Sequence, residues 1–135
     1  MNIQDLAIRF SEGSNHEGFD FDCQLIPGDS EVLQIIVSDF DEIPVYLSIT
    51  ETQILCIAYL WSEDEVLQEK RTDMLEAMLE LNIPIPLSAF SKIGDQYVLF
   101  GALVASSSFD DVAHEVITLA ENSVEAITAM TDYLK

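Results

Sequence analysis

The chain has very few basic residues. Among its 135 residues it carries five Lys and Arg against 25 Asp and Glu, which gives a net charge of −20. Nucleic-acid binding draws much of its affinity from Lys and Arg side chains that neutralise phosphates, and an anionic membrane surface repels a chain of this charge. We therefore exclude nucleic acid and direct binding to an anionic membrane. The acidic excess has two interpretations: it keeps an apolar-rich domain soluble, or it presents an acidic face to a basic partner.

Cysteine, proline and glycine are also scarce, with two, four and five residues. Few prolines and glycines beside a hydrophobic fraction of 49% indicate a globular protein. Cys23 and Cys56 both fall within expected strands, so we interpret them as reduced, buried thiols rather than a bridge or a reactive pair. No apolar run approaches the ~20 residues of a spanning helix, and residues 1–10 lack the apolar core of a signal peptide. We expect one cytoplasmic domain over residues 1–135.

Motifs that carry catalysis or metal binding are missing. His16 and His114 are the only histidines, and no H-x-x-x-H or C-x-x-C spacing exists, so both are expected at the surface. A Cys–His nucleophile would need an exposed Cys56, yet this residue lies in the most apolar stretch of the chain. We expect no catalytic residue, no metal ligand and no cofactor.

The acidic residues do not form a recognisable calcium loop. Asp20-Phe-Asp22 and Asp39-Phe-Asp-Glu42 come closest, but neither continues to the Gly and terminal Glu that such a loop needs. Paired carboxylates carry little information in a chain with 25 acids, and no Gly-rich phosphate loop is present. One alternative stays open, a small enzyme or ligand-binding domain with an acidic site.

Hydrophobic periodicity predicts an α+β fold. Short links between the strands argue for antiparallel pairing, because a parallel pair needs a long crossover. We expect an antiparallel sheet of about five to six strands with helices chiefly on one face, in the order α-β-β-β-β-α-β-β-α. The expected helices are 2–11, 62–82 and 108–134; the expected strands are 19–26, 32–37, 45–49, 53–61, 88–93 and 96–105; residues 12–18 are expected to form a loop.

Polar residues mark the expected helix starts. Asn2 is a plausible N-cap, Ser62 with Glu65 forms a capping box, and Ser108 with Asp111 forms an approximate cap. Asn82 followed by Pro84 ends the second helix. The stripe expected to be buried on this helix is Val66, Leu67, Met74, Leu75, Met78, Leu79 and Leu81, with Lys70 and Arg71 facing water.

Two strands are apolar on both faces, Ile54–Trp61 and Tyr97–Ala105. Such strands need cover on both sides, so we predict a homodimer that buries either the second sheet face or the long third helix. Gly94-Asp95 before the second of these strands is a two-residue hairpin turn. Gly101 within it marks either a bulge or a close approach by a neighbour.

The segment between the second helix and the fifth strand is unusually apolar for a connector. Each proline of Pro84-Ile85-Pro86-Leu87 drives the preceding residue toward extended geometry. With Phe90, this segment either packs under the final helix or forms a docking surface for an apolar peptide. We take Pro84, Ile85, Pro86, Leu87 and Phe90 as the candidate partner-binding residues.

Three segments, with the tail Ser123–Ile127, resemble the YjfI-like family of uncharacterised bacterial proteins: Gln53–Trp61, Glu76–Phe90 and Lys92–Ala102. The resemblance covers nearly the whole chain and is strongest over residues 45–134. It implies no established activity and no catalytic residue. The genes of its members have a genomic setting similar to that of genes for PspA-like membrane-stress proteins, which makes such a protein a candidate partner.

The element order and the acidic charge also resemble the type III secretion chaperone-like α+β fold, whose members are small, acidic, dimeric and bind protein clients. This likeness is one of fold. From both resemblances we expect a non-enzymatic, cytoplasmic protein-binding protein, a chaperone or adaptor, that forms a homodimer.

Overall fold

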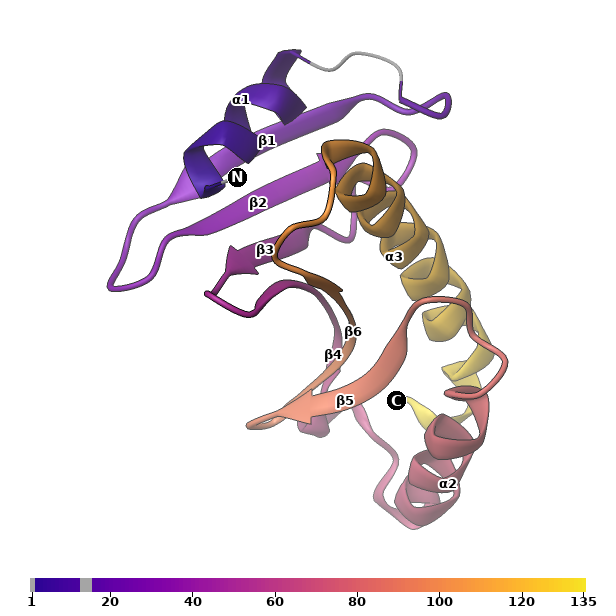
Figure 1. Cartoon of the computed structure of the whole chain (residues 1–135). Coiled ribbons are helices and arrows are strands. Elements are labelled where there is room, and N and C mark those ends of the chain that lie inside the picture. The colour runs from indigo at the N-terminus through magenta and orange to yellow at the C-terminus, as the bar shows by residue number, and fades with distance from the viewer. Residues whose placement is uncertain (1, 13–15) are drawn as a thin grey trace.

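The computed structural model describes residues 2–12 and 16–135, so positions 13–15 of the expected loop lie outside the described residues. The elements follow the expected order (Figure 1). The α-helices are α1 (Ile3–Glu12), α2 (Arg71–Leu81) and α3 (Phe109–Ala129); the strands are β1 (Phe21–Ile26), β2 (Val32–Val37), β3 (Val45–Ile49), β4 (Gln53–Ser62), β5 (Ala89–Ile93) and β6 (Gln96–Val104). Short 3₁₀ turns occupy Glu63–Glu65, Gln68–Lys70 and Thr131–Tyr133.

The six strands form one sheet in the order β1-β2-β3-β4-β6-β5, and every neighbouring pair is antiparallel. The predicted α+β class, strand number and antiparallel pairing are therefore confirmed. The meander breaks after β4, because β6 pairs with β4 and leaves β5 at the outer edge. The positive φ of 58° at Gly94 suits the tight β5–β6 hairpin.

One face of the sheet carries the core. Alternate residues of the strands point to α1 and α3 and are fully buried, among them Leu33, Leu47, Cys56 and Leu99. Figure 1 shows α3 running along one side of β4 and β6, with no helix on their other side. The helices therefore cover one face, as predicted, and leave the other without helical cover in the part of the chain that the structure describes.

The predicted helix start at Ser62 is wrong. Ser62 ends β4, its hydroxyl donates to the side chain of Glu65 at 3.2 Å, and α2 begins only at Arg71. The C-terminal tail explains the difference, because Val66 forms an antiparallel bridge with Leu134 and the N–H of Leu67 donates to the carbonyl of Tyr133 at 2.8 Å. Backbone groups bonded across the chain are not free to form a helix.

Two further expectations about the helices need correction. On α2 only Met74 and Met78 are buried, whereas Leu79 is 70% exposed. The third helix ends at Ala129 and gives way to a 3₁₀ turn, so it falls short of residue 134. The predicted N-caps of α1 and α3 are confirmed, since the N–H of Asp5 donates to Asn2 Oδ1 at 2.8 Å and that of Asp111 to Ser108 Oγ at 3.1 Å.

Within the described ranges, every helix is too short or too polar to cross a lipid bilayer.

Candidate functional site

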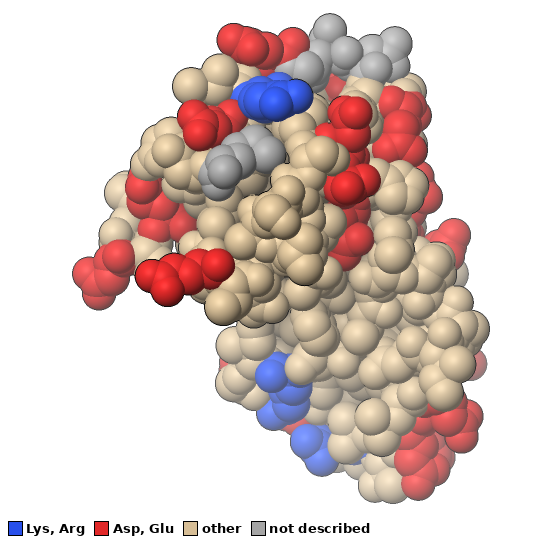
Figure 2. All heavy atoms as spheres, viewed as in Figure 1, with Lys and Arg blue, Asp and Glu red and all other residues tan. Residues whose placement is uncertain are grey.

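A groove of about 230 Å³ lies between the connector that follows α2 and the C-terminal half of α3. We call it the connector groove. Its lining is mostly apolar and consists of Leu81, Pro84, Ile85, Pro86, Phe90, Asn122, Glu125, Ala126 and Ala129. Figure 2 shows neutral side chains over the connector and the adjacent surface. The groove joins two segments that lie about 40 residues apart in the sequence.

Hydrogen bonds hold the connector against α3. The amide of Asn122, itself buried, donates to the carbonyl of Pro86 at 2.8 Å and to the hydroxyl of Ser88 at 3.0 Å. On the other side, the N–H of Phe90 donates to Asn82 Oδ1 at 2.6 Å, which ties the first residues of β5 to the end of α2. Proline fixes its own φ and these bonds fix the rest, so the groove is preformed.

Four of the five residues predicted from the sequence line this groove: Pro84, Ile85, Pro86 and Phe90. Phe90 is buried and forms the floor, with Trp61 behind it at a ring distance of 6.4 Å. Leu87 does not line the groove and is 56% exposed, with a positive φ of 66°. The connector packs against α3, as the first alternative of the sequence interpretation has it, and an apolar groove remains between them; docking of an apolar peptide there stays a prediction.

The α3 wall was missed from the sequence. Asn122, Glu125, Ala126 and Ala129 follow the spacing i, i+3, i+4 and i+7, which places them on one helix face. The small alanines and the polar Asn in an otherwise bulky apolar stripe are the feature of the sequence that would have indicated an open contact there. Glu125 is the one charged residue among those that line the groove.

A second polar cluster surrounds Glu63. Its carboxylate accepts hydrogen bonds from Tyr97 Oη at 2.8 Å, Arg71 Nε at 3.1 Å and Gln68 Nε2 at 3.2 Å, and Lys92 Nζ lies 4.0 Å away. Desolvation alone would raise the pKa of Glu63, but the hydrogen bonds from Tyr97, Gln68 and Arg71 outweigh it and lower the pKa. The cluster fastens the turn after β4 to β6 and α2.

Basic side chains in and near the Glu63 cluster have ion-pair or hydrogen-bond partners. Arg71 and Lys92 face Glu63, and Lys70 Nζ donates to the carbonyl of Asp132 at 3.1 Å. The expectation that Lys70 and Arg71 simply face water is therefore incomplete. Figure 2 shows the few Lys and Arg side chains of this view at the top and, in a small group, in the lower part of the molecule.

Glu115 of α3 is a buried carboxyl over the middle of the sheet, only 5% exposed, and its Oε1 has no hydrogen-bond partner within the described residues. Burial raises the pKa of Glu115, and the charge of nearby His114 opposes that shift in part. The carboxyl fills the space where Gly101 lacks a side chain, so Gly101 marks a close approach. Cys56 pairs with Gly101 across β4 and β6, and burial, followed by the charge of Glu115, raises the pKa of its thiol.

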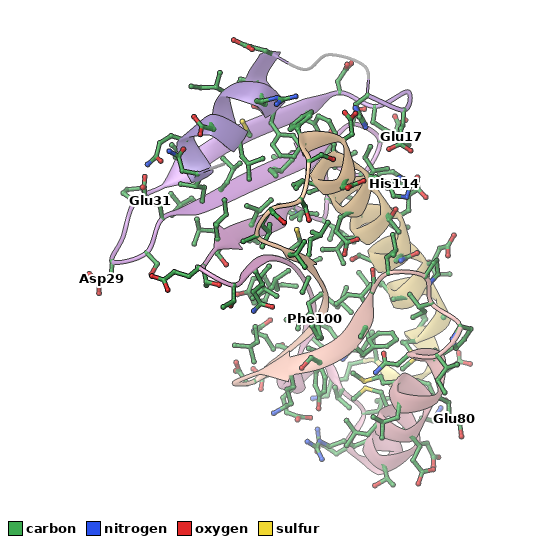
Figure 3. All side chains as sticks on the ribbon, in the orientation of Figure 1. Glu17, Asp29, Glu31, Glu80, Phe100 and His114 are labelled. Carbon is green, nitrogen blue, oxygen red and sulfur yellow. The ribbon has the colours of Figure 1, made fainter. Side chains whose placement is uncertain are left out.

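The other candidate groups fit structural roles. His114 Nδ1 lies 3.0 Å from a carboxylate oxygen of Glu17, and His16 Nε2 lies 3.4 Å from the same carboxylate. Figure 3 shows His114 and Glu17 side by side. Both cysteines are free, and Cys56 is fully buried. Across residues 2–12 and 16–135 no group of three or more His, Cys, Asp or Glu is arranged to hold a metal ion.

An open hollow of about 310 Å³ has three carboxylates in its lining. It is lined by Asp20, Phe21, Asp22, Ile36, Ser38 and Asp41. Asp20, Asp22 and Asp41 are exposed, and the hollow has neither a histidine nor a basic residue in its lining. Such a surface offers exposed carboxylates without the apolar enclosure that is typical of ligand and catalytic sites.

A model of the bacterial family described as "Uncharacterized protein conserved in bacteria (DUF2170)" matches residues 1–134. Among curated proteins, none matches the chain significantly. The fold is similar to those of several solved structures, each below 25% identity, so this similarity shows the fold alone.

One of these structures is the ExsC–ExsE complex, with a TM-score of 0.61, 13% identity and coverage of 95% of this chain and 96% of that one. A second is the Yersinia pestis type III secretion chaperone SycH in complex with a stable fragment of YscM2, with a TM-score of 0.52, 16% identity and coverage of 90% and 97%. A third is YbjN from E. coli, with a TM-score of 0.61, 14% identity and coverage of 83% and 84%.

Proposed function

The chain belongs to this family of uncharacterized bacterial proteins, and from that premise we propose that it is a non-enzymatic protein-binding protein, a chaperone or adaptor. The observation that carries the proposal is the connector groove. Its volume of about 230 Å³ lies below the ~300–1,000 Å³ of small-molecule sites but accommodates one or two apolar side chains. A preformed, proline-bounded groove of this size suits an anchor residue of another polypeptide.

The client segment we expect combines an apolar anchor with a basic neighbour. Glu125 lies at the groove among apolar lining residues, and the chain as a whole carries a net charge of −20. A Lys or Arg beside the anchor would face Glu125, and the overall field would attract a basic segment during encounter. An acidic segment would be repelled.

Finer expectations follow from the resemblance to the YjfI-like family. We propose a PspA-like membrane-stress protein as a candidate client, with the interaction in the cytoplasm. We further propose that residues 1–135 act as a single domain and that the protein works as a homodimer. The structures of similar fold that hold a second polypeptide, such as the ExsC–ExsE complex, support protein binding as the role of this architecture.

Selection from a displayed random-peptide library on the purified chain tests the proposal without choosing a client in advance. Enriched peptides are expected to pair an apolar residue with Lys or Arg. Ala129→Glu places a carboxylate in the groove lining and should weaken binding of the selected peptides at least tenfold. Thr128→Glu adds the same charge at an exposed position one residue away, outside the lining, and should leave binding nearly unchanged.

Failure to enrich any peptide, or equal losses in both variants, would contradict the groove assignment. Pull-down of a purified PspA-like protein at low salt then tests the specific client. A clean absence of binding in that assay removes PspA-like proteins as partners while leaving the peptide result intact.

The alternative of a small enzyme or ligand-binding domain with an acidic site would have to use the hollow of Asp20, Asp22 and Asp41. Replacing Asp22 and Asp41 by Asn should leave peptide binding unchanged under our proposal.

A further inference from the structure

The face of the sheet opposite α1 and α3 is almost free of charge. The strand register places 21 residues on this helix-free face: Asp22, Gln24, Ile26, Val32, Gln34, Ile36, Tyr46, Ser48, Gln53, Leu55, Ile57, Tyr59, Ser62, Ala89, Ser91, Ile93, Gln96, Val98, Phe100, Ala102 and Val104. Asp22 is the one charged residue among them. Since charged residues make up 22% of the chain, four or five would be expected on a face of this size.

The helix-free face is also apolar. Tyr59, Ile93 and Val104 are 44%, 46% and 65% exposed, although each is a large hydrophobic side chain. A hollow of about 300 Å³ lies beside β3 and β4, where Tyr46 and Tyr59 pack edge to face with ring centroids 5.7 Å apart. Its remaining lining residues, which are Ile26, Val32, Leu47, Ser48 and Ile57, carry no charge.

We infer that the helix-free face is the surface on which a second copy of this chain packs, through a two-fold symmetric interface. The inference rests on the proposed homodimer and names the face that forms it. In a two-fold interface the same surface patch meets itself, so every acid near the axis faces its own copy. A chain with a net charge of −20 meets itself with least repulsion where its acids are fewest, and the helix-free face carries one, Asp22 on the outer strand β1.

The exposed side of α3 is less suitable for a two-fold symmetric interface. The exposed side of α3 carries Asp110, Asp111, Glu121 and Glu125, which would face like charges across a two-fold axis. A basic client would be recognised by several acids, whereas the helix-free face carries one, Asp22. The size also fits, because 21 residues a side lies at the lower end of the roughly 20–30 residues in a standard protein interface.

Analytical ultracentrifugation of the purified full chain over a concentration series tests the inference. The wild type should sediment with a mass near twice 15.1 kDa, and added salt should tighten the dimer because it screens repulsion between the two acidic bodies. Tyr59→Glu should raise the dimer dissociation constant at least tenfold. Val124→Glu, at a site on α3 that is 39% exposed, adds the same charge away from this face and should leave the constant within about twofold.

Circular dichroism checks that each variant folds. If Tyr59→Glu does not fold, Val104→Glu at the more exposed end of β6 repeats the test. A wild type that stays at 15.1 kDa at all concentrations overturns the inference. So does a dimer broken by Val124→Glu and not by Tyr59→Glu, or a monomer in which Tyr59→Glu abolishes peptide binding. A monomer that still binds peptides through the connector groove fails this inference alone, whereas a dimer that binds none fails the proposed function alone.

Discussion

Replacing Gly101 by Ala tests the packing at the centre of the molecule. A methyl group at this position would overlap Glu115 Oε1 and would lie 3.0 Å from Glu115 Cδ and 3.0 Å from the carbonyl oxygen of Leu87. Two of these atoms belong to a buried side chain, and the third belongs to the backbone of the connector. Relief of the overlap therefore requires the buried Glu115 side chain to change its conformation or the connector backbone at Leu87 to shift.

Two opposing contributions set the magnitude. Replacing Gly by Ala within a strand usually stabilises by roughly 0.5–1 kcal/mol, because the unfolded chain loses backbone freedom. Overpacking a filled site costs about 1–3 kcal/mol. The Glu115 side chain is 5% exposed, so moving its carboxyl means repacking a buried group, and the cost should exceed the gain. We expect Gly101→Ala to lower the free energy of unfolding by about 1–2 kcal/mol.

Urea denaturation measures this change, with the fluorescence of Trp61, the one tryptophan of the chain, and circular dichroism as independent signals. The double variant Gly101→Ala/Glu115→Ala removes the overlapping carboxyl. The cost of Gly101→Ala should therefore shrink by about 1 kcal/mol or more in the Glu115→Ala background. A Gly101→Ala variant as stable as the wild type, or equal costs in both backgrounds, would refute the close approach.

Three further predictions concern single groups. Glu115 has a raised pKa in the folded state, so its contribution to stability is complete below its unfolded pKa of about 4.3 and is lost as the pH rises through the folded value. Glu115→Gln should therefore gain in stability relative to the wild type as the pH rises from about 4 to about 8, which urea titrations at several pH values measure. A stability difference between the two proteins that does not change with pH would contradict the assignment. Because burial raises the pKa of the Cys56 thiol, a maleimide should label Cys23 in the folded protein and Cys56 only after unfolding, which mass spectrometry of the labelled peptides decides. Asn122→Ala leaves the carbonyl of Pro86 without its donor and should cost about 1–3 kcal/mol, with faster hydrogen exchange at the start of β5; unchanged exchange there would show that the amide does not hold the connector.

Most of the elements could be predicted because they depend on local patterns. Alternation predicted β1 and β3, β-branched residues predicted β2, and polar caps at Asn2 and Ser108 located two of the helix starts. The wrong start at Ser62 has a non-local cause. The capping-box residues are present, but the tail residues Tyr133 and Leu134 bond to the backbone at Val66 and Leu67, about 70 positions earlier.

The candidate site was predicted from one side only. The proline-rich connector is recognisable by itself, because apolar residues with two prolines between a helix and a strand are unusual. Its α3 wall, from Asn122 to Ala129, has no signal that links it to residues 84–90, and only the fold brings the two together. Leu87 shows the opposite kind of error, because the sequence grouped it with the groove residues, whereas at its positive φ it turns away from the groove.

The central claim is that this protein acts by binding another polypeptide in the connector groove. Hydrogen–deuterium exchange of the full chain, with and without a peptide selected from the displayed library, tests it most directly. The account predicts slower exchange at residues 83–90 and along the C-terminal half of α3, with little change at residues 20–41. Protection centred on residues 20–41, or no protection at the groove when the peptide is bound at saturation, would contradict it.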